Sequence, residues 1–277
     1  MGEAVQDEFT EPIRHALQNR PGALEKLLRD VQDYIFNLSL RMLWDPTDAE
    51  DATQEILLKV ANNLGGFRFE SKFTTWVYSV ASNHLLTARK PKASSRVISL
   101  SKFREEVIHS GNVKRFEEEI EDKLLEEEIR LGCVHAVLLR LTNSDRLVFV
   151  LSTVFGMGGE EGAQVLEISP ENFRQKLSRA KKKLSSFLSE NCGMWAGEKA
   201  CPCLGIPKHI LKENQENGKF FAELRKLKKQ NPYLEEPSLA TELKQIDKLA
   251  QIYRSQAYYS TPGKILSSLK NLKVIGS

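Results

Sequence analysis

The stretch GMGGEEGAQVLEISPENFRQKLSRAKKKL, residues 156–184, sets two short helical patterns on either side of a turn. The apolar spacing predicts a short first helix over residues 160–166 and a turn over residues 167–169. Pro170 suits the first turn of the second helix, where its missing N–H costs no hydrogen bond. This order predicts a helix-turn-helix, a motif whose second helix enters a DNA groove.

The second helix of this motif is expected to have one apolar face and a basic remainder. Its apolar residues recur every three or four positions, and they are Phe173, Leu177, Ala180 and Leu184. The residues expected to reach base edges or phosphates are Arg174, Gln175, Ser178, Arg179 and Lys181. An isolated basic helix is more often a solvated domain edge, but the preceding helix and turn favour DNA binding. Gly162 stands where an aliphatic residue usually packs, and this predicts a short or irregular first helix.

An acidic ridge is expected on a helix further upstream, within DAEDATQEILLKVANNLGGFRFESKFTTWVYSVASNHLL, residues 48–86. Asp48, Asp51 and Glu55 recur at three and four residues, so they share one side of this helix. The adjacent side is the expected buried stripe, formed by Ala49, Ala52, Ile56, Val60 and Leu64. Rows of charge usually face water, and the ridge taken alone favours a solvated face over a binding face.

Aromatic and basic residues alternate in the loop FRFESKF, residues 67–73, and in the helix that follows it. The mixed set is Phe67, Arg68, Phe69, Lys72 and Trp76, with Ser79 and Asn83 continuing the Trp76 side. Unpaired bases stack on aromatic rings with about 1–3 kcal/mol each, while Lys and Arg hold the phosphates. The pattern indicates a surface for unpaired DNA. The alternative is that the rings are core, which we adopt for Phe73.

The remaining periodicity is helical and no stretch has a clear strand pattern, so the sequence predicts an all-α fold. We expect a helical domain over residues 1–90, an acidic linker over 91–132, a helix-turn-helix domain over 133–190, and a Cys-containing helical extension over 191–277. The linker contains EEEIEDKLLEEE, residues 117–128, which suits a solvated acidic helix.

Composition excludes several classes of protein. Hydrophobic residues make up 41% and charged residues 28% of the 277, as in globular proteins, and the net charge is only +3. No run approaches the roughly 18 apolar residues of a spanning helix, and the first residues lack a signal-peptide pattern. We therefore expect a cytoplasmic protein without membrane insertion. No nucleophile, phosphate-binding loop or pair of acids stands out, so an enzyme is not expected.

Residues 156–184 resemble the region 4 helix-turn-helix of extracytoplasmic-function (ECF) sigma factors, a group of the sigma-70 family. Residues 48–86 resemble region 2 of the same family, and the two occur in the family's order. The resemblance covers roughly residues 24–188. It implies an alternative sigma factor that binds core RNA polymerase, recognises the −10 and −35 promoter elements, and promotes DNA melting.

The resemblance also implies roles for particular residues. The polymerase-binding set, facing the clamp, is Asp48, Asp51, Gln54 and Glu55, and the flap is a further polymerase contact. The −10 set is Phe67, Arg68, Lys72, Trp76 and Asn83, and the −35 set is Arg174, Gln175, Ser178, Arg179 and Lys181. Four residues depart from the family pattern: Glu167 and Phe69 replace glycines, and Ser79 and Ser82 stand where Arg is frequent.

The residues after 190 leave more alternatives open. Cys192, Cys201, Cys203 and His209 offer up to four ligands for zinc or another metal, but their spacing is not a standard one. A metal-sensing or redox-sensing tail, a structural metal site and inert thiols all fit them. The tail tyrosines Tyr253, Tyr258 and Tyr259, with Pro262, suit packing on the first two domains or on polymerase, and a tail covering the helix-turn-helix would inhibit it.

Two other functions fit parts of the pattern. One is a one-component helix-turn-helix regulator with a metal- or redox-responsive tail, which would bind duplex DNA without polymerase. The other is a protein-interaction adaptor, for which Arg174 and Arg179 would be dispensable. An anti-sigma factor is a further partner that the resemblance allows.

Overall fold

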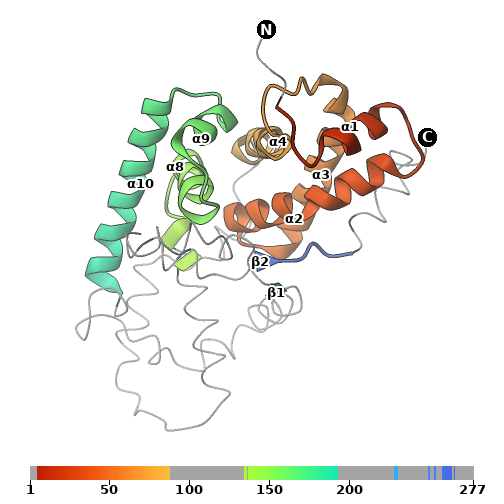
Figure 1. The fold of residues 1–277 in the computed structure, drawn as a ribbon. Helices are drawn as coiled ribbons and strands as arrows, with labels where there is room; N and C mark the ends of the chain where they lie inside the picture. The colour runs from red at the N-terminus through yellow and green to blue at the C-terminus, as the bar shows by residue number, and fades with distance from the viewer. Residues whose placement is uncertain are drawn as a thin grey trace.

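The computed structural model describes residues 5–87, 134–135, 137–192, 228–229, 249, 253, 258–263 and 265. The predicted all-α fold is confirmed, since nearly all of the regular structure in these ranges is helical (Figure 1). The elements are α1 (Thr10–Leu17), α2 (Ala23–Leu43), α3 (Pro46–Asn63), the 3-10 turn η1 (Leu64–Gly66), α4 (Phe73–Thr87), α8 (Asn143–Phe149), the π-helical turn η2 (Val150–Val154), α9 (Gly159–Val165), α10 (Pro170–Asn191), β1 (Lys228–Lys229) and β2 (Tyr258–Tyr259). None of the described helices is long and apolar enough to cross a membrane.

Helices α1 to α4 form the first helical unit, and local sequence signals fix where its two long helices meet. Helix α2 ends at Trp44, whose left-handed φ of 52° turns the chain, and α3 starts immediately after Asp45. The Asp45 carboxylate accepts a hydrogen bond from the backbone N–H of Asp48 at 2.9 Å, and Pro46 occupies the first helical position. The stripe predicted on α3 is buried, as expected: Ala49, Ala52, Ile56, Val60 and Leu64.

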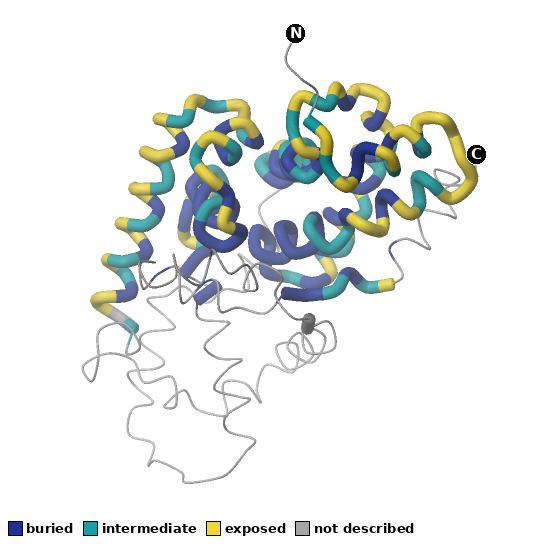
Figure 2. The backbone as a smooth tube through the Cα atoms, viewed as in Figure 1, coloured by how far each residue is buried: buried dark blue, intermediate teal, exposed yellow. Residues whose placement is uncertain are grey.

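Helices α8 to α10 form the second helical unit, in which α10 lies along one outer edge of the molecule (Figure 1). The predicted helix-turn-helix is present as α9 and α10. The Ser169 hydroxyl accepts a hydrogen bond from the Asn172 N–H at 3.2 Å and caps α10, which begins at Pro170. On α10, buried and exposed positions alternate along the axis because only one side meets α8 and α9 (Figure 2).

The two units pack directly against each other. Helix α4 of the first unit meets α9 of the second, where the Thr75 hydroxyl donates to a Glu161 carboxylate oxygen at 2.8 Å. The Trp44 ring stacks on His135, with ring centroids 3.5 Å apart. A single hydrophobic cluster runs through both units, so their interface is continuous with their cores.

Arg146 of α8 is the main polar link between the units. Its guanidinium donates to the Met42 carbonyl at the end of α2 at 2.6 Å, and to three carbonyls of its own unit, those of Leu138, Leu139 and Leu141. Burial lowers the pKa of Arg146 to about 10, so the group still carries its charge near neutral pH. The buried charge is therefore matched by carbonyl dipoles from both units.

Parts of the chain after residue 192 pack on both units. β1 and β2 pair antiparallel over two residues each, a small departure from the purely helical expectation. The predicted tail tyrosines Tyr253, Tyr258 and Tyr259 are all buried. Tyr253 packs edge-on against Phe149 of α8, and Tyr259 lies in a cluster with α2 and α3. Of the two locations that the sequence leaves open, these residues occupy the one on the helical units.

Candidate nucleic-acid interface

The acidic side of α3 is accessible along its length. Asp51 and Glu55 are exposed, while Asp48 and Gln54 are half-buried. These four residues flank the buried stripe of the same helix, which anchors the face to α2 and α4. The face is therefore held on a rigid element, and its exposed carboxylates, Asp51 and Glu55, can attract a positively charged partner.

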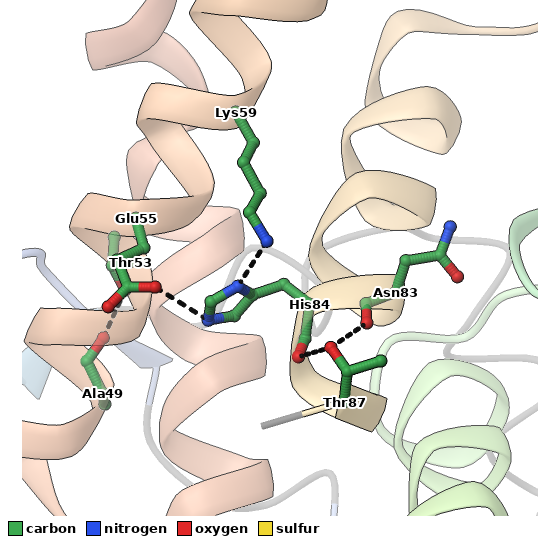
Figure 3. Close-up of polar contacts among 7 residues, drawn as sticks. All are labelled: Ala49, Thr53, Glu55, Lys59, Asn83, His84 and Thr87. Carbon is green, nitrogen blue, oxygen red and sulfur yellow. Dashed lines mark hydrogen bonds and ion pairs between the residues drawn. The ribbon is translucent and has the colours of Figure 1, made fainter. Parts of the chain in front are cut away.

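His84 of α4 connects to this face through two charged residues of α3 (Figure 3). Lys59 Nζ lies 2.9 Å from His84 Nδ1, and a Glu55 carboxylate oxygen lies 3.8 Å from His84 Nε2. Burial lowers the pKa of His84 below 6.5, the Lys59 charge lowers it further, and Glu55 opposes both. The imidazole is then neutral at pH 7, with Nδ1 accepting from the Lys59 ammonium and the Nε2 proton directed at Glu55.

The loop between α3 and α4 carries the aromatic cluster. Phe67 is 7% exposed and Phe73 is fully buried, whereas Trp76 is half-buried, and the centroids of Phe67 and Phe73 lie 5.5 and 5.7 Å from that of Trp76. Phe67 and Phe73 thus support Trp76 from inside the unit, and Trp76 is the ring of the three with the largest accessible edge. Of the other residues in the −10 set, Arg68, Lys72 and Asn83 are exposed.

An N-terminal segment, which the sequence patterns do not single out, holds this loop in place. The Asp7 carboxylate accepts hydrogen bonds from the backbone N–H groups of Phe73 at 2.8 Å and of Phe9 at 3.0 Å. It therefore caps the start of α4 from 66 residues away. The Val5 N–H donates to the carbonyl of Phe69, which itself has a left-handed φ of 58°. An acidic residue so far along the chain from α4 carries no local signal for this contact.

The basic helix α10 presents its polar residues to solvent. Arg174, Gln175, Ser178 and Arg179 are exposed and Lys181 is half-buried, while Phe173 and Ala180 on the opposite side are fully buried. Arg174 lies 3.8 Å from Glu160 of α9, and the Gln175 amide donates to Glu171 at 3.2 Å. Both contacts are exposed to solvent and each stabilises the fold only slightly, so a DNA phosphate can replace the Glu160 or Glu171 carboxylate.

The residues that depart from the expected helix-turn-helix pattern have a structural reason. Phe173 packs so closely on α9 that a Cβ at Gly162 would come within 2.4 Å of its ring. Gly162 is therefore required by the size of Phe173, and α9 is short, at Gly159–Val165. Glu167 in the turn has a left-handed φ of 52°. Phe69, the other residue that stands where a glycine was expected, also has a left-handed φ, of 58°.

The cysteine set is described only at its first member. Cys192 closes α10 and is a half-buried free thiol. Cys201, Cys203 and His209 lie outside the described residues, so the metal-site prediction stays a prediction. Among the residues that the structure describes, no group of three or more His, Cys, Asp or Glu side chains is arranged to hold a metal ion.

Comparison with known proteins identifies two segments of the chain. Residues 27–94 match the family model "Sigma-70 region 2", and residues 131–184 match "Sigma-70, region 4". The chain is 26% identical to the RNA polymerase sigma-H factor of Pseudomonas aeruginosa over 189 residues, which cover 66% of this chain and 95% of that protein. It is 23% identical to the ECF RNA polymerase sigma factor SigW of Bacillus subtilis over 183 residues, covering 64% of this chain and 95% of SigW.

One solved structure is similar over a comparable share of the chain. It is that of CnrH in complex with the cytosolic domain of CnrY, and the similarity covers 66% of this chain and 99% of the matched chain in that structure. The identity is 20% and the TM-score is 0.48. The two family models end at residues 94 and 184 of this chain, so residues 185–277 lie outside both matches.

Proposed function

The chain belongs to the extracytoplasmic-function group of the sigma-70 family, and we propose that it acts as an alternative sigma factor that directs core RNA polymerase to promoters. The observation that carries this proposal is the order of its surfaces. An acidic helix face, an aromatic and basic loop, and a helix-turn-helix follow one another on two packed helical units. A one-component regulator would need only the last of these, so the region 2 match favours the sigma factor.

The acidic face of α3 is the proposed contact with the polymerase clamp. Asp48, Asp51, Gln54 and Glu55 lie on a helix whose other side is core, so binding requires no rearrangement of α3. Complementary charge would set the orientation of docking and its rate. The neutral His84 beside Glu55 leaves the negative charge of that carboxylate undiminished at pH 7.

The loop between α3 and α4 is the proposed −10 surface. Trp76 offers a partly accessible ring for an unstacked base, and Arg68 and Lys72 are exposed for the phosphates of the separated strand. Asn83, further along α4, extends the polar side of this surface. Phe67 belongs to the proposed set through its support of Trp76, because only 7% of its surface is accessible.

Helix α10 is the proposed reader of duplex DNA at the −35 element. Arg174, Gln175, Ser178 and Arg179 project from the side opposite the buried Phe173 face, and Lys181 lies beside them. Arg and Gln suit base edges, whereas Lys suits phosphates. We propose further that the chain performs no chemistry of its own, acts in the cytoplasm where polymerase is found, and has an anti-sigma factor among its regulators.

Binding to core polymerase tests this function. The purified chain is expected to co-elute with core enzyme, and the double reversal Asp51→Lys, Glu55→Lys is expected to abolish co-elution. Asp30→Lys is the matched control, because Asp30 is an exposed acid on α2, outside the proposed face. Equal retention of wild type and the double variant would remove the proposed docking face. Failure of the wild type to bind any core enzyme would remove the function.

A further inference from the structure

Two neighbouring parts of the C-terminal segment are anchored on different helical units. Tyr253 belongs to the second unit, because its ring packs edge-on against Phe149 with centroids 4.9 Å apart and its hydroxyl donates to the Val134 carbonyl at 3.1 Å. Six residues later, Tyr259 is anchored on the first unit, where its ring joins a buried cluster with α2 and α3. This short segment therefore bridges the two units.

The anchor on the first unit is a set of directional hydrogen bonds to α2. Asn37 is fully buried and uses both ends of its amide, donating to the Tyr259 carbonyl at 2.7 Å and accepting from the Tyr259 N–H at 3.0 Å. One turn earlier, an Asp33 carboxylate oxygen accepts from both the N–H and the hydroxyl of Thr261, at 2.8 and 2.7 Å. The α2 surface thus recognises an extended backbone and one hydroxyl side chain.

The ring of Tyr259 completes this anchor. It is 4% exposed and packs with Phe36, Leu40 and Trp44 of the first unit and with Ala49 of α3. Ala49 is one residue from Asp48, which belongs to the proposed polymerase-binding face. The anchor on α2 therefore adjoins the surface at which polymerase is proposed to dock.

With both anchors in place, the two units cannot separate far. The six residues from Tyr253 to Tyr259 span at most about 20 Å when fully extended. The −10 and −35 elements are about 25 base pairs apart, which at ~3.4 Å per base pair is ~85 Å of duplex. The proposed −10 surface lies close to α10 here, because α4 packs on α9 and α9 packs on α10. The axes of packed helices are about 8–10 Å apart, so two such contacts separate α4 from α10 by far less than the length of this duplex. The bridged arrangement cannot engage both elements at once.

We propose that residues Tyr258–Thr261 are a releasable latch, which adds to the direct packing of the two DNA-binding units and must leave α2 before the chain engages a promoter. This inference rests on the proposed function, because the need to open follows from the separation of the two promoter elements. Release at α2 exchanges its four hydrogen bonds for hydrogen bonds to water and exposes the Tyr259 ring, so the latch adds to the free energy of opening. The chain between Thr87 and Val134 is long enough to span ~150 Å at full extension.

The latch is tested on the full chain without polymerase, by small-angle X-ray scattering. The variant Asp33→Ala, Tyr259→Ala removes both bonds to Thr261 and the ring of the anchor. Alanine is the strongest helix former, so the change at residue 33 does not weaken α2. Asp30→Ala is the matched control, an exposed acid on the same helix. We expect the double variant to open more readily than wild type and to show a larger radius of gyration, with the helical circular dichroism retained, and the control to match wild type.

A second measurement connects the latch to initiation. At limiting core polymerase, the double variant is expected to yield at least about threefold more promoter-specific transcript than wild type, because less binding energy is used to open it. An unchanged radius of gyration in the double variant overturns the latch even where wild type transcribes. A larger radius with unchanged transcript overturns its role as a gate. Absence of transcript from every variant refutes the proposed function and leaves the scattering result to decide the latch.

Discussion

Gly162→Ala gives a sharp test of the helix-turn-helix packing, because helix propensity and packing predict opposite signs. Alanine in place of glycine inside a helix normally stabilises it by about 1 kcal/mol. Here the added methyl would lie 2.4 Å from Cζ and 2.5 Å from Cε2 of Phe173. Overpacking of a well-filled core costs typically 1–3 kcal/mol, and a contact this short belongs near ~3. The expected net effect is a loss of about 2 kcal/mol.

The Phe173 ring has little room to yield. It is fully buried, and its neighbours Val148 and Ala163 are buried as well. Phe173→Leu vacates space on the same side and alone costs on the order of 1 kcal/mol. In the double variant Gly162→Ala, Phe173→Leu, the methyl occupies the vacated space, so the two losses should not add, and their coupling should exceed ~1 kcal/mol.

Thermal unfolding followed by circular dichroism measures these differences. A loss of about 2 kcal/mol corresponds to a midpoint lower by roughly 4–8 °C. A Gly162→Ala variant as stable as wild type, or more stable, would refute the packing argument. Additive losses in the double variant would show that the two residues do not meet.

Three further predictions concern other parts of the molecule. Arg146→Met should lower the free energy of unfolding by several kcal/mol, and with it the midpoint of thermal unfolding, because four carbonyls lose their buried donor and the contact between the units loosens. Arg146→Lys should not restore stability, since one ammonium cannot reach all four carbonyls. Full rescue by Lys would contradict this reasoning. The pKa of His84, measured by NMR titration, should lie below 6.5, closer to 6.5 in Lys59→Met and lower still in Glu55→Gln. Because the folded state holds His84 neutral, its contribution to stability is present above pH 6.5 and is lost as pH falls through the folded pKa. A pKa at or above 6.5 would contradict the geometry of Figure 3. Arg179→Ala should weaken binding to the −35 duplex. If Arg179 contacts a phosphate, the slope of log affinity against log salt concentration should fall by about 1. An unchanged slope with an altered base preference would show that Arg179 contacts a base instead.

Local patterns were sufficient for the helices and for their inner faces. The stripe from Ala49 to Leu64 and the face from Phe173 to Leu184 could be predicted because each depends on the 3.6-residue period alone. The capping residue Ser169 and the proline after it fix the start of α10 in the same local way. The side of α10 that faces solvent follows directly from the side that is buried.

Contacts between distant residues could not be predicted in this way. Asn37 and Tyr259 are 222 residues apart, and Arg146 and the Met42 carbonyl are 104 apart, so no periodicity connects them. No local pattern explains Gly162 either, because the reason for it is the position of the Phe173 ring in three dimensions. The acidic, −10 and −35 residue sets stay predictions; most of their members are exposed or half-buried, and Phe67 is buried.

Run-off transcription with purified, sigma-free core polymerase tests the central claim most directly. On genomic promoter fragments from the same organism, core enzyme with this chain is expected to produce transcripts with defined start sites that core enzyme alone does not produce. Asp51→Lys, Glu55→Lys should remove those transcripts, and Asp30→Lys should retain them. If the chain binds these fragments but never confers a defined start on the polymerase, it is not a sigma factor.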